Sequence, residues 1–241
     1  MDQVTLTLRF APELRFFLLP RERGERVRVR HDTTSTLGHV IESLGVPRTE
    51  IGPLRADGDQ VTTAHRPTDG QSIEIDAPAR PQRTPFDHIR FLLDVHLGTL
   101  ARRLRLLGVD TAYDNDRDDA ALVVQANDEQ RILLTRDRGL LCRRGLLAGA
   151  HVHHTDPELQ LDEVLRRFDP PLAPFTRCPT CNGLVEPATK QQVSGELEAG
   201  TRATYDTFTR CRSCGRVYWP GAHHDRLVRI VERVQGSART A

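Results

Sequence analysis

The sequence predicts a mixed α/β protein built from three parts, and three observations carry this prediction. Residues 2–76 combine strand-like alternation with one short helical segment, residues 86–169 alternate strands and helices, and residues 176–219 hold two CxxC pairs. Hydrophobic residues make up 38% and charged residues 28% of the chain, which is typical of a folded, water-soluble protein. Two proline-rich segments, 77–85 and 170–175, are predicted linkers.

The N-terminal part reads as strand, strand, helix, short strands and strand. Apolar residues alternate with polar ones from Val4 to Leu8 and again around Val27 and Val29, which is the period of a strand. Apolar residues at helical spacing occupy 36–44, and Ile73 and Ile75 mark a last strand. This order is that of a ubiquitin-like β-grasp, which we place at residues 1–77.

The central part, residues 86–169, shows the rhythm of a parallel sheet. Apolar runs and helical spacing predict strands at His88–Asp94, Val109–Tyr113, Arg131–Thr135 and Ala150–His154, and helices at Leu97–Leu107, Asp118–Ala126 and Pro157–Phe168. Strands that alternate with helices predict an open, mostly parallel α/β sheet.

Four cysteines predict a zinc ribbon at residues 176–234, with a closing helix at His223–Val234. Cys178 and Cys181 form one CxxC pair, and Cys211 and Cys214 form the second. Two such pairs can supply a tetrahedral set of four thiolates, which leaves no open position for water, so we expect structural Zn²⁺ rather than two disulfides. Between the pairs, 194–208 is expected to form a loop and a hairpin.

Acidic residues follow two strands of the predicted parallel sheet. Asp94 ends the first strand, and Asp137 comes shortly after the third. Functional groups gather beyond the carboxyl ends of strands in open α/β sheets, and Asp119 could point to the same crevice, with Asp116 and Asp118 nearby. Converging carboxylates suit Mg²⁺ or Mn²⁺, which activate water and bind phosphate oxygens. The sequence therefore supports phosphodiester hydrolysis.

Each of these acids also has a purely structural interpretation. Asp118 is the expected N-cap of its helix, Asp119 could complement the helix dipole, and Asp137 could cap the turn after its strand. Asp94 is the hardest to explain structurally, because a carboxylate directly after a core strand is costly without a partner.

Basic residues beside the acids leave two alternatives open. Arg136 and Arg138 flank Asp137 and could hold phosphate, but a solvated or salt-bridged arginine is as good an interpretation. His151, His153 and His154 are expected to be surface residues.

The quoted motifs together resemble a known family. The segments FLLDVHLGTLARRLRLLGVDTAYDND, RILLTRDRGL, RCPTCNG and RCRSCGRVYWPGAHHDRL occur in that order between residues 91 and 227. They resemble the Mut-seven-C RNase domain family, which is PIN-like with a zinc ribbon. The resemblance implies that Asp94, Asp119 and Asp137 are nuclease acids, with Asp116 or Asp118 as a possible fourth, and that the four cysteines bind zinc. Gly139 departs from the longer polar residue usual in the family.

The resemblance also implies a function and partners. We expect a metal-dependent ribonuclease that acts on RNA; the alternatives are a non-catalytic RNA-binding or ribosome-associated adaptor and an interaction scaffold. The N-terminal part resembles the ubiquitin-like domain often fused to this family, but it ends in DAPARP without diglycine, so a protein partner is a better expectation than sulfur-carrier chemistry. No secretory signal or membrane span is visible, so we expect a cytoplasmic protein.

Charge is unevenly distributed along the chain. Residues 86–170 carry twelve basic and fifteen acidic residues, and residues 171–241 carry ten basic and six acidic ones. An acidic middle suggests bound metal there, and a basic C-terminal part suggests contact with an anion.

Overall fold

The computed structural model describes residues 3–221 and 224–238. The chain divides into two compact units. The first unit contains Met1–Asp87 and Arg117–His153, and the second contains His88–Asp116 and His154–Ala241. No helix in the described ranges is both long enough and apolar enough to cross a membrane.

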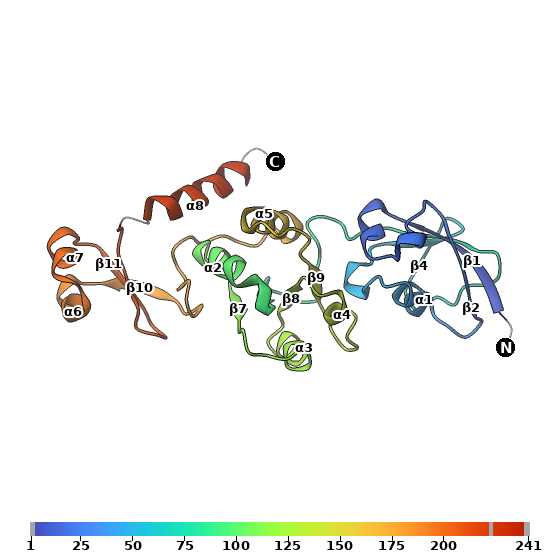
Figure 1. The fold of residues 1–241 in the computed structure, drawn as a ribbon, viewed down its shortest axis with the longest axis horizontal. Helices are drawn as coiled ribbons and strands as arrows, with labels where there is room; N and C mark the ends of the chain where they lie inside the picture. Colours follow the sequence, from blue (N-terminus) through green and yellow to red (C-terminus); the bar gives the residue numbers. More distant parts are fainter. Residues whose placement is uncertain (1–2, 222–223, 239–241) are drawn as a thin grey trace. The chain divides into compact units, whose positions relative to one another are not determined.

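The N-terminal part of the first unit is a five-stranded sheet, drawn in blue and cyan in Figure 1. Its elements are β1 (Gln3–Phe10), β2 (Val27–Asp32), α1 (Leu37–Ser43), β3 (Leu54–Ala56), β4 (Asp59–Val61) and β5 (Ser72–Ile75), with short 3-10 turns η1 (Pro12–Phe16), η2 (Pro20–Glu22) and η3 (Arg48–Glu50). The strand order is β2-β1-β5-β3-β4. β1 runs parallel to β5 and antiparallel to β2, so the predicted β-grasp order is confirmed.

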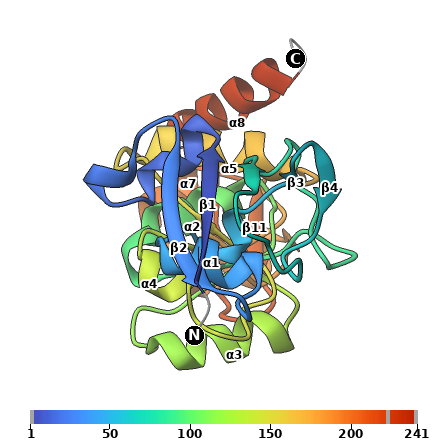
Figure 2. The same ribbon diagram turned by 90° about the vertical axis from the view of Figure 1, so that its right-hand side faces the viewer.

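A single apolar core holds this domain together. Alternate residues of β1, such as Leu6 and Leu8, are fully buried against Val40 and Ile41 of α1. Figure 2 looks onto β1 and β2 with α1 beside them. The apolar side chains that alternate along β1 therefore face this helix, as expected for a sheet with one buried face.

The central sheet is parallel, as predicted. In the second unit, β6 (Phe91–Leu93) pairs in parallel with β7 (Thr111–Tyr113). In the first unit, β8 (Ile132–Thr135) pairs in parallel with β9 (Gly149–His151). The accompanying helices are η4 (Val95–Leu97), α2 (Gly98–Leu106), α3 (Asp119–Asp128), α4 (Arg138–Leu141) and α5 (Pro157–Phe168).

The strand predicted at His88–Asp94 is shorter than expected. Its ladder with β7 begins at Phe91, opposite Thr111, and ends at Leu93. β7 itself begins only at Thr111, after the turn that contains Gly108, so residues 88–90 have no partner in β7. The three residues that do form the strand are completely buried.

The cysteine-bearing part forms a small antiparallel sheet with the order β10-β11-β12. Its strands are β10 (Val185–Ala188), β11 (Phe208–Cys211) and β12 (Val217–Tyr218). The loop and hairpin predicted at 194–208 are wrong, because this stretch contains η5 (Ser194–Glu196) and α7 (Ala199–Thr204), which follow α6 (Lys190–Val193). Figure 1 shows α6 and α7 beside β10 and β11.

These short helices have identifiable causes. Thr189 and Gln192 form a reciprocal capping box that starts α6. Val193 and Leu197 are buried with Phe208 in a small core of their own. α8 (His224–Ala238) corresponds to the helix predicted at His223–Val234, of which His223 lies outside the described residues.

Candidate metal centre and acidic residues

The four cysteine sulfurs lie close together. Their Sγ atoms are all within 4.8 Å of one another. The Cys178–Cys214 and Cys181–Cys211 sulfur pairs are 3.7 Å and 3.4 Å apart. Four thiolates around one zinc ion at about 2.3 Å are separated by about 3.8 Å at the edges of a tetrahedron. The donor set therefore fits structural zinc.

Each CxxC pair, together with the residue that follows it, forms a knuckle. The two knuckles have the same backbone turn. Asn182 follows the second cysteine of the first knuckle, and its N–H donates to the Cys178 carbonyl at 2.9 Å. Gly215 holds the equivalent place in the second knuckle, and its N–H donates to the Cys211 carbonyl at 3.0 Å. Both residues are left-handed, with φ of 71° and 73°. This turn brings two sulfurs of each CxxC pair to one side.

Tyr218 adds a hydrogen bond to the sulfur cluster. Its hydroxyl lies 2.9 Å from the Cys178 sulfur. Burial alone would raise the pKa of the Cys178 thiol, but hydrogen bonds from Tyr218 and from the backbone N–H groups of Cys181 and Thr180 lower it to about 6. A donor of this kind supports a thiolate ligand from the second coordination shell.

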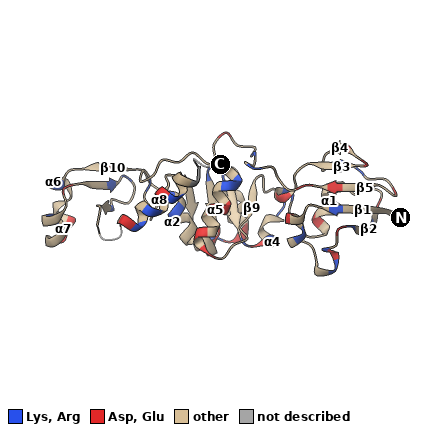
Figure 3. Cartoon of the chain, turned by 90° about the horizontal axis from the view of Figure 1, so that it is seen from above, with Lys and Arg blue, Asp and Glu red and all other residues tan. Residues whose placement is uncertain are grey.

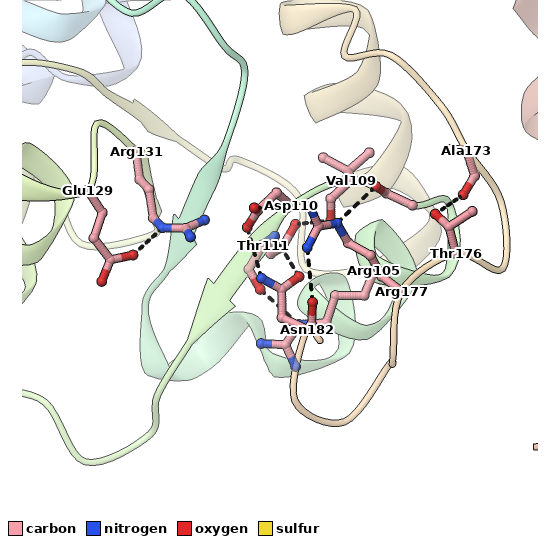
Figure 4. Close-up of polar contacts among 11 residues, drawn as sticks. Arg105, Val109, Asp110, Thr111, Glu129, Arg131, Ala173, Thr176, Arg177 and Asn182 are labelled. Atoms are coloured by element: carbon pink, nitrogen blue, oxygen red, sulfur yellow. Dashed lines mark hydrogen bonds and ion pairs between the residues drawn. The ribbon is translucent and has the colours of Figure 1, made fainter. Parts of the chain in front are cut away.

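Asn182 fastens the first knuckle to the central sheet, as Figure 4 shows. Its side-chain oxygen accepts from the Thr111 N–H at 3.0 Å, and its amide donates to Asp110 at 2.8 Å. Arg177 pairs with Asp110 at 3.1 Å and donates to the Asn182 carbonyl at 3.0 Å. The left-handed residue of the knuckle is thus also its anchor.

Arg105, from α2, completes this connection. Its Nε donates to the Thr111 carbonyl at 2.8 Å, and its Nη1 donates to the carbonyls of Pro179 and Thr180 at 3.1 Å and 2.8 Å. The side chain is buried, and desolvation lowers the pKa of its guanidinium. Three backbone acceptors compensate part of the cost of burying this charge.

Asp94 directly follows β6 and is buried, with 8% of its surface exposed. Its carboxylate accepts from the Val95 N–H at 2.6 Å and caps η4. The Tyr113 hydroxyl donates to the Val95 carbonyl at 2.9 Å, which holds the turn that carries Asp94. A capped carboxylate keeps acceptor capacity, because an ionised carboxylate has two oxygens.

Asp137 comes two residues after the end of β8. Its backbone N–H donates to the hydroxyl of Thr135 at 2.9 Å, and its carboxylate accepts from the Gly139 N–H at 2.7 Å. Asp137 therefore caps α4, as its structural interpretation proposed, and its side chain is exposed.

The acids around the start of α3 have separate partners. Asp118 caps α3 by accepting from the Ala121 N–H at 2.8 Å, so the predicted N-cap is confirmed. Asp119 lies in the first turn and pairs with Arg143 at 3.0 Å. Asp116 donates its backbone N–H to the carboxylate of Asp114 at 3.1 Å. An arginine on Asp119 supplies the positive charge that a metal would otherwise provide.

The basic residues beside Asp137 belong to contacts within the first unit. Arg138 donates to the Phe17 carbonyl at 3.2 Å, and its guanidinium lies 5.8 Å from the centre of the Phe16 ring. The carbonyl of Arg136 lies 3.1 Å from Nε2 of His151. Arg138 thus connects α4 to the β-grasp domain.

The expected surface position of His151 is wrong, whereas His153 and His154 are exposed. His151 is 4% exposed, because the β-grasp domain covers β9. Glu50 of η3 accepts from the His151 N–H at 2.7 Å, and the Phe16 and Phe17 rings lie 5.1 Å and 5.5 Å from the imidazole.

Sequence patterns gave no signal for several of these residues. Tyr218 and Arg105 act through contacts that depend on the tertiary fold. Asn182 could have been recognised, because Asn–Gly after a CxxC pair is a left-handed turn signal. Arg143 could not have been linked to Asp119, because the two are 24 residues apart in the chain.

Comparison with known proteins supplies the family. The model of the Mut7-C RNAse domain matches residues 89–231, and the model of the Mut7-C ubiquitin domain matches residues 3–87. The solution structure of the Haloferax volcanii HVO 2177 protein is similar at 20% identity with a TM-score of 0.27, over 32% of this chain and 85% of that one. No curated protein matches. Because the RNAse-domain match spans more than half of the chain, the protein belongs to the Mut7-C RNAse domain family, here with a Mut7-C ubiquitin domain in front.

Proposed function

We propose that this protein is a metal-dependent ribonuclease that hydrolyses RNA phosphodiester bonds. The observation that carries the proposal is the match of residues 89–231 to an RNAse-domain family, which indicates a nuclease. The proposed ligands of the catalytic metal are Asp94, Asp119 and Asp137, with Asp116 and Asp118 as possible further acids. We place the activity in the cytoplasm.

The chemistry of the acids supports this assignment. Bound Mg²⁺ or Mn²⁺ would lower the pKa of a water molecule and neutralise charge on the phosphate. Asp94 is held by the turn at Val95 and is buried, so its orientation is fixed before substrate arrives. Thr135 holds the backbone of Asp137 in the same manner. Arg136 and Arg138 remain candidates for phosphate contacts, although Arg138 also binds Phe17.

Replacing aspartate with asparagine separates the catalytic from the capping role. Asparagine caps a helix about as well as aspartate, so Asp137→Asn should keep α4 but remove the charge that holds a metal. We expect Asp94→Asn and Asp137→Asn each to lower RNA cleavage by at least about two orders of magnitude. Added Mn²⁺ should partly restore each single variant, and the double variant should be little worse than either one.

Asp156→Asn is the matched control for these variants. Asp156 caps α5 through the N–H groups of Glu158 and Leu159, but it is no proposed ligand. Its cleavage rate should equal that of the wild type. Zinc content and the unfolding transition should be measured for every variant. Equal cleavage in the wild type, Asp94→Asn and Asp137→Asn would refute the proposed catalytic role.

A non-catalytic RNA-binding adaptor is the second candidate, and the ion pair of Asp119 favours it. An acid whose charge is met by Arg143 can have a structural task alone. The variant Arg143→Gln decides between the two functions. If the ion pair is only structural, Arg143→Gln should lower the free energy of unfolding as much as Asp119→Asn does. A catalytic Asp119 predicts that Arg143→Gln keeps most of the cleavage while Asp119→Asn loses it.

A further inference from the structure

A cavity in the second unit has the composition of a base-binding site. Its volume is about 340 Å³, and it lies among the ribbon strands, the end of α2 and the start of α8. The rings of Phe175, Tyr218, Trp219 and His224 line it. We propose that this cavity, called here the aromatic pocket, stacks a base of single-stranded RNA. The inference rests on the proposed function, because it names the form in which RNA is held.

Two of the four aromatic side chains are exposed, and the other two are partly buried. Phe175 is 40% and Trp219 is 39% exposed. The rings of Phe175 and His224 lie 5.5 Å apart at an angle of 36°. Exposed aromatic rings around one hollow offer π-faces to a base, and stacking on such faces is how proteins bind unpaired bases without reading their sequence. The volume falls in the range of small-ligand sites, about 300–1,000 Å³.

Phe175 adopts a backbone conformation that bulky residues rarely take. Its φ is 63°, in the left-handed region. This conformation is held by a hydrogen bond from the Phe175 N–H to the Leu106 carbonyl at 2.9 Å and by one from Ala173 to Leu107, also at 2.9 Å. Strained residues of this kind persist where surrounding contacts fix them, and they gather at ligand sites. The strain here places an aromatic ring at the pocket.

Two other lining residues are fixed by contacts at their far ends. The Tyr218 hydroxyl lies 2.9 Å from the Cys178 sulfur, so the zinc site holds this ring. Arg177 pairs with Asp110 and donates to the Gly108 and Asn182 carbonyls. The walls are therefore preformed, which reduces the entropy lost when a ligand binds.

Charge around the pocket favours RNA over an apolar peptide. Residues 171–241 carry ten basic and six acidic residues. Arg226 and Arg229 are exposed on α8, one residue before and two residues after Leu227, which lines the pocket. Figure 3 shows basic residues along α8, together with acidic residues on the same helix. Phosphates of a nucleic-acid strand would meet these side chains while a base enters the aromatic pocket.

Trp219 provides a direct test, because it is the chain's only tryptophan. Full-length protein should be titrated with a single-stranded oligoadenylate, without added Mg²⁺ or Mn²⁺, while Trp219 emission is recorded. We expect saturable quenching. Phe175→Leu keeps apolar bulk but removes the ring, so it should weaken binding about tenfold, whereas Phe175→Tyr should bind as the wild type does. Leu159→Ala, at an exposed position of α5 outside the pocket, is the control and should change nothing.

A second variant guards against misfolding of the first. Trp219→Leu should weaken binding of a 5′-labelled oligoadenylate, followed by fluorescence anisotropy, to a similar extent. Wild-type affinity in both Phe175→Leu and Trp219→Leu would overturn the proposal. Equal affinity for adenosine monophosphate and the oligonucleotide would overturn the assignment to RNA, and so would quenching by an apolar peptide but not by RNA.

Failure of this inference and failure of the nuclease proposal give different results. In one case RNA quenches Trp219 emission, Phe175→Leu weakens the quenching, and the protein does not cleave RNA. This result would support the pocket and refute the nuclease. Metal-dependent cleavage with an unchanged KM in Phe175→Leu, together with no quenching, would refute the pocket and leave the nuclease standing.

Discussion

Lowering the pH from 7 to 5 should destabilise the first unit, because folding buries His151 in its neutral form. Burial lowers the pKa of this imidazole to about 4, and the charges of His153, Arg136 and Arg138 act in the same direction, against a hydrogen bond to the Arg136 carbonyl. Nδ1 is buried and has no hydrogen-bond partner within the described ranges. A protonated Nδ1 would therefore find no hydrogen-bond acceptor there.

The sign and size of the effect follow from proton linkage. Between about pH 6.5 and pH 4 the unfolded chain binds a proton that the folded unit does not, so stability falls as the pH falls. For pKa values of 6.5 unfolded and about 4 folded, the free energy of unfolding should drop by about 2 kcal/mol between pH 7 and pH 5.

Urea unfolding of the full chain at pH 5, 6, 7 and 8 measures this change. His151→Gln cannot be protonated, so its curve should be flatter by that amount, while His154→Gln, at an exposed position, should follow the wild type. A wild-type curve that is level between pH 5 and pH 7, or a His151→Gln curve with the wild-type slope, would refute the reasoning.

Three further predictions concern the ribbon. Cys211→Ser should release about one zinc ion per chain, by elemental analysis, and unfold residues 176–219; no zinc in the purified wild type would refute the metal assignment. Asn182→Gly keeps the left-handed turn but loses the bonds to Thr111 and Asp110, so it should cost about 1–3 kcal/mol in urea unfolding; an unchanged midpoint would contradict this. Arg216 donates to a neutral hydroxyl, whereas Arg212 pairs with Glu186, so Arg216→Gln should reduce the salt dependence of RNA binding by about one unit of slope and Arg212→Gln by less; equal slopes for both variants would show that these ion pairs do not matter.

The fold could be predicted where local signals were strong. The alternation of apolar residues in β1 and their helical spacing in α5 predicted those elements correctly. In both elements one face is buried, and the order of apolar and polar residues follows that burial. The short helices α6 and α7 were missed, because four to six residues carry no full helical period. Their presence depends on a capping box and a small buried cluster around Phe208.

The sequence predicted the metal-binding cysteines of the candidate site but not the contacts around the site residues. Spacing alone identified the four cysteines, whose sulfurs the fold brings together. The pairing of Asp119 with Arg143 and the burial of His151 under Glu50 depend on contacts between segments distant in the chain. Composition could not reveal the aromatic pocket either, because its rings come from the linker, β12 and the residues that follow.

The anchor at Thr111 has a consequence for the behaviour of the protein without zinc. β7 is an outer strand of its sheet, and such strands expose backbone groups on which another chain can pair. Here the Thr111 N–H is taken by Asn182 and the Thr111 carbonyl by Arg105. Asn182 belongs to the first knuckle, which we expect to unfold when zinc is lost. Loss of zinc should therefore expose unpaired backbone groups on the edge strand β7. The metal-free protein should then self-associate at concentrations where the zinc-loaded protein remains monomeric.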